Sequence, residues 1–147
     1  MAYRDRELLA RIIKCEAGGE GVNGMKAVAT VIMNRVRVPY GEYARVGQGN
    51  INKVIYQPRQ FTCTMEEVYG QYNPQNIYNT PPEKEHYDVA DWALAGNVHW
   101  GAGESLWYFN PYSPKCVSAF PYNGNGKYFN IVNQHCFYIA TEKYAKT

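Results

Sequence analysis

The sequence predicts an α+β fold, with helices in the N-terminal two thirds and short antiparallel strands near the C-terminus. Segments with hydrophobic residues at helical spacing, bounded by capping residues, recur up to about residue 95. Runs rich in aromatic and β-branched residues, which are typical of strands, appear only after residue 104. The length of 147 residues, 46% of them hydrophobic, fits one domain (1–147) with one sizeable core.

Two helices are expected at the start of the chain. Asp5 can cap the first, and one face of it carries Leu8, Leu9, Ile12 and Ile13. Gly18 and Gly19 are expected to end this helix, because glycine readily adopts a left-handed conformation. The second helix is expected over about 22–36, buried and central, because residues 27–33 are apolar nearly all round.

The next stretch offers weaker signals. Residues 39–49 are rich in turn-forming residues and are interpreted as a loop, and 52–56 as one helical turn stopped by Pro58. The run Thr64–Glu67 fits a capping box, which predicts a helix start there. Residues 71–79 are polar and rich in asparagine, and are interpreted as a loop.

A third long helix is expected after Thr80. Thr80 can cap it, Pro81 suits the first helical position, and Glu83 would complete a capping box. This helix is expected to run to about Ala95 and to stop at Gly96.

Two strands are predicted near the C-terminus, over 105–109 and 131–139, from their aromatic and β-branched content. The intervening residues 110–130 are interpreted as a long ordered loop or an irregular sheet.

Charge and hydropathy exclude several classes of protein. The net charge is +2 and no block of five like charges occurs, which argues against nucleic-acid binding. No apolar run approaches the ~18 residues that a membrane span needs. The start MAYRDREL lacks the apolar segment of a secretory signal. The protein is therefore expected to act where it is made or to leave by another route, and a removed leader stays open.

Aromatic residues make up 15% of the chain, and there are 14 tyrosines. A tyrosine ring suits either an aromatic core or a sugar-binding surface, and both interpretations stay open.

The four cysteines show no C-x-x-C spacing, so neither a structural zinc site nor any other metal or cofactor is predicted. Cys15 is interpreted as a small buried residue of the first helix. Cys116 and Cys136 both lie in the C-terminal third and form a candidate disulfide, whose formation depends on the redox state of the compartment.

Glu16 is the strongest candidate for chemistry. Its side chain shares a helix face with Ile12 and Ile13, while Arg11 and Lys14 lie on the opposite face. A carboxyl group desolvated on such a face keeps its proton to higher pH, as a general acid requires. The alternative is a glutamate at a helix end that reaches solvent.

Glu20 lies beyond the two glycines and need not share a face with Glu16. We expect it in the first turn of the second helix, where negative charge is favourable. It is also the candidate second carboxylate, since retaining glycosidases use close carboxylate pairs.

The histidines give weaker signals. His86 is expected on the surface of its helix. A nucleophilic pair of Cys15 with His135 is conceivable, although no local motif supports it.

Four blocks stand in a specific order along the chain. They are Leu9-Ala10-Arg11 with Glu16–Gly21 and Asn34-Arg35-Val36, then Val54–Phe61, then Ser105–Pro111, and last Asn133–Tyr138. Over about residues 5–140, the chain resembles the SleB/CwlJ family of bacterial spore-cortex-lytic cell wall hydrolases. The short length, the missing leader and the SLWYF…HCFY ending resemble the CwlJ branch most.

The resemblance implies a compact lysozyme-like domain acting on peptidoglycan, in particular on spore cortex with muramic-δ-lactam during germination. It implies a location at the boundary of spore coat and cortex, and a spore-coat protein as a partner. The family's catalytic acid matches Glu16. Residues expected in the cleft or its scaffold are Gln60, Phe61, Tyr108, Asn110 and His135. Tyr122 joins them as a guess for a sugar-stacking rim, from the tyrosines of residues 110–128.

The predicted reaction is cleavage of the glycosidic bond between N-acetylmuramic acid and N-acetylglucosamine. Glu16 alone suffices if the muramic 6-hydroxyl attacks its own anomeric carbon, as in a lytic transglycosylase. If water attacks, a second carboxylate is required, and Glu20 is the candidate.

Other classes stay open. They are a glycan-binding or spore-coat structural protein without catalysis, a peptide-cleaving amidase or cysteine enzyme, and a phage or vegetative wall enzyme.

Overall fold

Most helices precede the main sheet along the chain, which confirms the predicted α+β fold. The computed structural model describes residues 3–58, 60–113 and 115–147, so Arg59 of the second sequence block lies outside the described residues. The elements in order are α1 (Asp5–Ala17), α2 (Gly21–Arg37), α3 (Gly41–Gly47), α4 (Ile51–Ile55), the 3₁₀ turn η1 (Thr62–Thr64), β1 (Glu67–Val68), β2 (Gln71–Tyr72), α5 (Lys84–Leu94), β3 (Trp107–Phe109), β4 (Gly126–Val132), β5 (His135–Ala140) and α6 (Glu142–Ala145).

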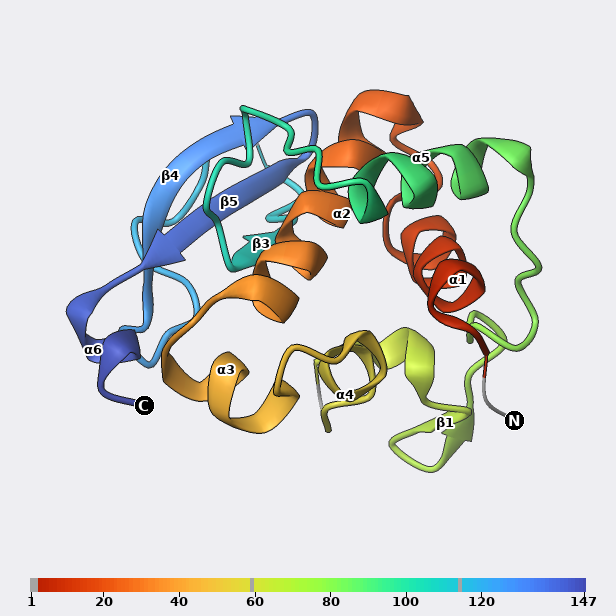
Figure 1. Ribbon diagram of the computed structural model, residues 1–147, viewed down its shortest axis with the longest axis horizontal. Coiled ribbons are helices and arrows are strands. Elements are labelled where there is room, and N and C mark those ends of the chain that lie inside the picture. Colours follow the sequence, from red (N-terminus) through yellow and green to blue (C-terminus); the bar gives the residue numbers. More distant parts are fainter. Residues whose placement is uncertain (1–2, 59, 114) are drawn as a thin grey trace.

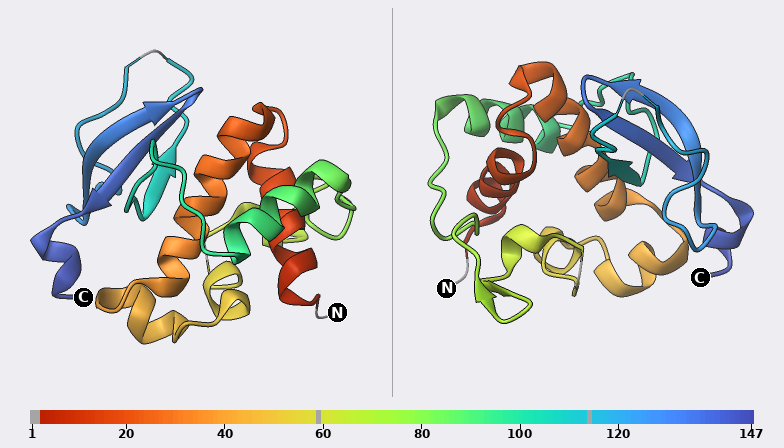
Figure 2. Two further views of the ribbon diagram at one scale, coloured as in Figure 1. Left: turned by 45° about the horizontal axis from the view of Figure 1, so that its top comes forward. Right: turned by 180° about the vertical axis from the view of Figure 1, so that it is seen from behind.

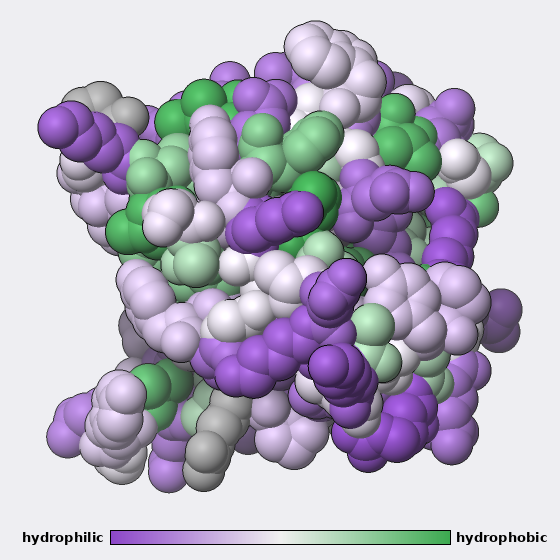
Figure 3. Space-filling view, turned by 90° about the vertical axis from the view of Figure 1, so that its left-hand side faces the viewer, coloured by the Kyte–Doolittle hydropathy of each residue, from purple (hydrophilic) through white to green (hydrophobic). Residues whose placement is uncertain are grey.

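Helix α2 occupies the centre of the fold, as its apolar sequence predicted. The three-stranded sheet lies on one side of it and the pair α1–α5 on the other, with α3 and α4 beneath (Figures 1 and 2). Residues on several faces of α2 are buried, because they pack against both layers. The end of the molecule that carries β4 and α6 shows its hydrophobic residues mainly in the upper half, among hydrophilic ones (Figure 3).

The sheet is antiparallel with strand order β3-β5-β4. Residues 131–139 were predicted to be one strand, and this is wrong, because Asn133 and Gln134 form the tight turn between β4 and β5. Asn133 has φ 52°, a left-handed conformation that asparagine tolerates better than most residues. Aromatic and β-branched residues on both sides of the turn concealed it in the sequence.

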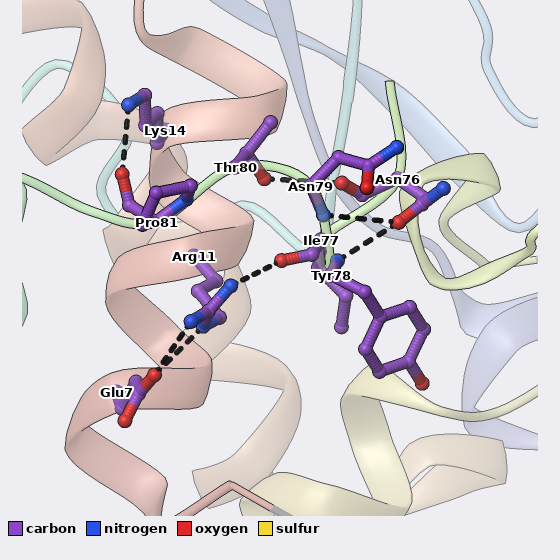
Figure 4. Close-up of polar contacts among 9 residues, drawn as sticks. All are labelled: Glu7, Arg11, Lys14, Asn76, Ile77, Tyr78, Asn79, Thr80 and Pro81. Carbon is purple, nitrogen blue, oxygen red and sulfur yellow. Dashed lines mark hydrogen bonds and ion pairs between the residues drawn. The ribbon is translucent and has the colours of Figure 1, made fainter. Parts of the chain in front are cut away.

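The segment before α5 is held by the side chains of α1 rather than by helical bonds (Figure 4). Arg11 donates to the carbonyl of Ile77 at 2.6 Å, and Lys14 donates to that of Pro81 at 2.8 Å. The hydroxyl of Thr80 donates to the carbonyl of Asn76. Thr80 therefore does not cap a helix, contrary to the prediction.

Helix α5 begins instead at Lys84, with Glu83 and His86 forming the capping box. His86 is 3% exposed, so its expected surface position is wrong; the ring is drawn inward because Nδ1 accepts a hydrogen bond from the Glu83 N–H. Gly96, with φ +96°, follows the end of the helix as expected.

Other local predictions also failed. Residues 39–49 contain α3, whose Tyr43 packs into a second hydrophobic cluster; this tertiary contact outweighs the turn-rich sequence. No helix begins at residues 64–67, which connect the end of η1 to the start of β1. The Thr64 hydroxyl donates to the Phe61 carbonyl and does not cap a helix. Residues 71–72 form the strand β2 at the start of the predicted loop.

The break between α1 and α2 differs in detail from the prediction. Helix α1 ends at Ala17, and Gly18 has a right-handed φ of −59°. The left-handed residue is Gly21, with φ +76°. Of the helices in the described ranges, none is long and apolar enough to cross a membrane.

Candidate active site

Glu16 lies in the last turn of α1, and its carboxyl group contacts residues from two other elements. Its Oε1 accepts a hydrogen bond of 2.5 Å from the hydroxyl of Tyr108 on β3. Its Oε2 lies 3.1 Å from Sγ of Cys63 in η1. Burial raises the pKa of Glu16, and the Tyr108 hydrogen bond and the Arg35 charge oppose this rise without cancelling it. The carboxyl group is therefore suited to hold a proton for donation.

Tyr108 remains a donor over the same pH range. Burial raises its pKa well above the usual value, and the negative charge of Glu16 raises it further.

A disulfide between Cys15 and Cys63 closes one side of this site. The interpretation of Cys15 as an unpaired buried residue is therefore wrong; its partner is 48 positions away, and no local motif signals the pair. The sulfur of a disulfide carries no proton, so Cys63 cannot donate to the Glu16 carboxylate. The sulfurs and the carboxylate lie within metal-binding distance of one another, but oxidised cysteines are not thiolate ligands.

The second disulfide joins Cys116 to Cys136 of β5, so all four cysteines are paired. A nucleophilic Cys15 is excluded in this oxidised form.

The two disulfides should differ in their effect on stability. Replacing Cys15 and Cys63 together by alanine should cost about 4 kcal/mol, and replacing Cys116 and Cys136 about 3 kcal/mol, because the cost rises with the length of the closed loop. Urea unfolding under oxidising conditions measures both losses. Each double variant is the control for the other. A loss below about 1 kcal/mol for the Cys15–Cys63 pair would contradict the role of this bond in holding η1 on α1.

Two cavities meet at Glu16 and Tyr108, which line both. The first, of about 340 Å³, is also lined by Arg35, Gln60, Phe61 and Trp107. The second, of about 600 Å³, is also lined by Lys14, Glu20, Asn110 and His135. A carboxyl group at the junction of two cavities can act on a bond of a chain that occupies both.

Arg35 belongs to this site, although in the sequence it stands out only as part of the block Asn34-Arg35-Val36. It is 5% exposed, and its Nε donates to the carbonyl of Leu106 at 2.7 Å. The guanidinium lies 5.0 Å from the ring centre of Tyr43 and 5.2 Å from that of Phe61. In the sequence, a buried arginine on a helix cannot be told from an exposed one. No local pattern could therefore have identified Arg35 as a residue of the site.

Glu20 precedes α2 as its N-cap residue, close to the expected position, but its side chain does not cap the helix. Its Oε2 lies against Nδ1 of His135, and the two side chains are 10% and 9% exposed. Burial lowers the pKa of His135 below its usual value, and the nearby Glu20 carboxylate opposes this shift.

The structure brings most of the predicted residues together. Gln60 and Phe61 line the first cavity, and Asn110 and His135 the second. Tyr122 is 74% exposed, packs against Phe120, and is absent from the lining of both cavities.

Comparison with known proteins places the chain in a family. Residues 19–138 match the family described as Cell Wall Hydrolase. Cell wall hydrolase CwlJ of Bacillus subtilis (strain 168) is 31% identical over 137 residues, which are 93% of this chain and 86% of that protein. A spore cortex-lytic enzyme of Bacillus cereus is 36% identical over 111 residues, 75% of this chain and 36% of that protein.

A solved structure is similar over nearly the whole chain. The catalytic domain of the germination-specific lytic transglycosylase SleB from Bacillus anthracis matches with a TM-score of 0.63 and 27% identity, covering 94% of this chain and 96% of that one. The match to the family over most of the chain confirms the resemblance seen in the sequence, and this protein belongs to the cell wall hydrolase family.

Proposed function

We propose that this protein cleaves the glycosidic bond between N-acetylmuramic acid and N-acetylglucosamine in peptidoglycan, as a lytic transglycosylase with Glu16 as the only catalytic acid. Glu16 protonates the oxygen that leaves the muramic residue. The muramic 6-hydroxyl then attacks its own anomeric carbon and closes a 1,6-anhydro ring.

The observation that carries this proposal is the position of Glu16 at the junction of two cavities, with its pKa raised by burial. A glycan strand that runs from one cavity into the other passes its bonds across this carboxyl group. The relative with a solved structure is described as a lytic transglycosylase, which supports the same chemistry here.

A covalent intermediate on Glu20 is disfavoured by its contacts. Each oxygen of its carboxylate already has a protein partner, Oε2 the imidazole of His135 and Oε1 the backbone N–H of Gln134 at 3.4 Å. A nucleophilic carboxylate in a retaining glycosidase needs a free oxygen that faces the sugar.

Spore cortex is the proposed substrate, and the spore wall at the boundary of coat and cortex the proposed location. The support is that relatives over most of this chain are described as cell wall hydrolase CwlJ and spore cortex-lytic enzymes. A spore-coat partner protein remains part of this proposal.

Product analysis tests the reaction. Purified cortex digested by the wild-type protein should release fragments with 1,6-anhydromuramic ends, visible in mass spectrometry as a loss of one water relative to reducing ends. Reducing muramic ends would instead show that water attacks. Intact cortex with no soluble fragments would favour a glycan-binding protein, and free peptides would favour an amidase.

A further inference from the structure

We propose that His135 is the catalytic base of this reaction and that Glu20 is the residue that positions it. His135 accepts, at Nε2, the proton of the hydroxyl group that attacks the anomeric carbon. This inference rests on the proposed function, because it assigns the second proton transfer of the same reaction.

The contact between Glu20 and His135 sets the chemistry of the imidazole. A carboxylate against Nδ1 favours the tautomer with its proton on that nitrogen. The lone pair of Nε2 is then available as a proton acceptor. Among the residues that the structure describes, no hydrogen bond engages Nε2, and His135 lines the second cavity.

The fold holds this pair from several sides. The turn between β4 and β5 is bound to Glu20, because Asn133 Nδ2 donates to the Glu20 carbonyl at 2.9 Å and the Gln134 N–H donates to Oε1. Gly24 faces Glu20 from the first turn of α2. A Cβ atom at Gly24 would lie 2.6 Å from Cβ of Glu20, so glycine leaves the space that this side chain occupies.

The pair also lies beside the acid. The rings of His135 and Tyr108 meet edge to face, with their centroids 5.2 Å apart, and the hydroxyl of Tyr108 binds Glu16. One tyrosine ring therefore separates the base from the acid. Glu20 lies against His135 before α2. The other titratable and charged groups that line the same cavity are Tyr108 on β3, Tyr112 after it, and Glu16 and Lys14 on α1.

The proton transfers balance. The 6-hydroxyl gives its proton to Nε2 as its oxygen bonds to the anomeric carbon. The glycosidic bond breaks, its electron pair goes to the leaving oxygen, and that oxygen takes the proton of Glu16. Solvent water then carries the proton from His135 back to Glu16, and both groups return to their starting state. Burial keeps His135 neutral near neutral pH by lowering its pKa, as a base requires.

The test compares rates of release of anhydromuramic ends from purified cortex across the pH range. His135→Gln should lower the maximal rate by about 10²- to 10³-fold, and the fall in rate at acid pH that the imidazole causes should disappear. His135→Ala should recover part of its rate when imidazole is added to the assay. If the substitution only removed a hydrogen bond from the scaffold, added imidazole would not restore the rate. The loss of rate would then also not be confined to the acid limb of the pH profile.

Two further variants test the positioning role without removing the base. Glu20→Gln should lower kcat about tenfold with little change in KM, since it weakens a general base whose full contribution is about 10²- to 10⁴-fold. Gly24→Ala should give a similar loss in kcat, because the added Cβ displaces Glu20. His99→Gln is the matched control. His99 pairs with Asn23 away from both cavities, and its replacement should leave the rate and the pH profile unchanged.

Different outcomes overturn this inference and the proposed function. A His135→Gln protein that is folded, equally active and unchanged in pH profile overturns the base assignment, as does a His135→Ala protein that imidazole does not rescue. A wild-type protein that releases no anhydromuramic ends overturns the proposed function instead. If His135 variants fail to fold, an unchanged kcat in both Glu20→Gln and Gly24→Ala overturns the positioning role.

Discussion

The Glu16→Gln protein should fold normally and should lose about 10³- to 10⁴-fold of its activity on peptidoglycan, at the upper end of the contribution of one general acid. Glutamine keeps the shape of the side chain and can still accept the hydrogen bond from Tyr108, but it has no proton to give. Initial rates on purified cortex measure the loss. Glu7→Gln makes the same change at a half-buried residue of α1 that lines neither cavity, and it should leave activity unchanged.

The same substitution should change how stability depends on pH. Because the folded-state pKa of Glu16 is raised above its unfolded value, its contribution to stability is full below the unfolded pKa and is lost as pH rises through the folded pKa. Glutamine does not titrate. The variant should therefore gain stability relative to the wild type as pH rises through that range. Urea unfolding at a series of pH values measures this difference, and parallel curves for the two proteins would contradict the raised pKa.

Arg35→Met should produce the largest loss of stability from one substitution in the site. Methionine keeps much of the volume but leaves the buried carbonyl of Leu106 without its donor, which costs about 1–3 kcal/mol, and the contacts with two aromatic rings are lost in addition. The free energy of unfolding in urea measures this loss. Arg37→Met is the matched control, because Arg37 lies on the same helix and its side chain donates a hydrogen bond of 3.2 Å to the carbonyl of Ala93.

The same variant should also shift the activity profile. The positive charge of Arg35 lowers the pKa of Glu16, so its removal raises that pKa further. The fall in rate at alkaline pH should therefore move to higher pH in Arg35→Met. Arg35→Lys keeps a charge near the acid and should move the alkaline limb less. An alkaline limb that stays in place in Arg35→Met would show that Glu16 is not the group that titrates there.

Much of the fold could be predicted because its helices carry their own signals. The spacing of apolar residues predicts the apolar stripe of α1 and the all-round apolar surface of α2. In the structure these residues are buried. The failures cluster where contacts distant in sequence replace local bonds. Thr80 has the residue types of a helix cap, yet Lys14 and Arg11 of α1 hold its segment extended. The turn at Asn133 is hidden between strand-forming residues, and its docking on Glu20 fixes it.

The sequence alone determined that a glutamate ends the apolar face of the first helix, since helical periodicity places Glu16 beside Ile12 and Ile13 whatever surrounds the helix. Only the tertiary structure decided what surrounds that carboxyl group. Tyr108 and Cys63 contact it from two separate elements, and the charge of Arg35 acts on it from a third. The tertiary structure also turned Glu20 from a residue of a helix start into the partner of His135. The physical reason is that spacing reports which residues share one element, whereas a pKa and a proton path depend on groups that packing brings together from distant positions.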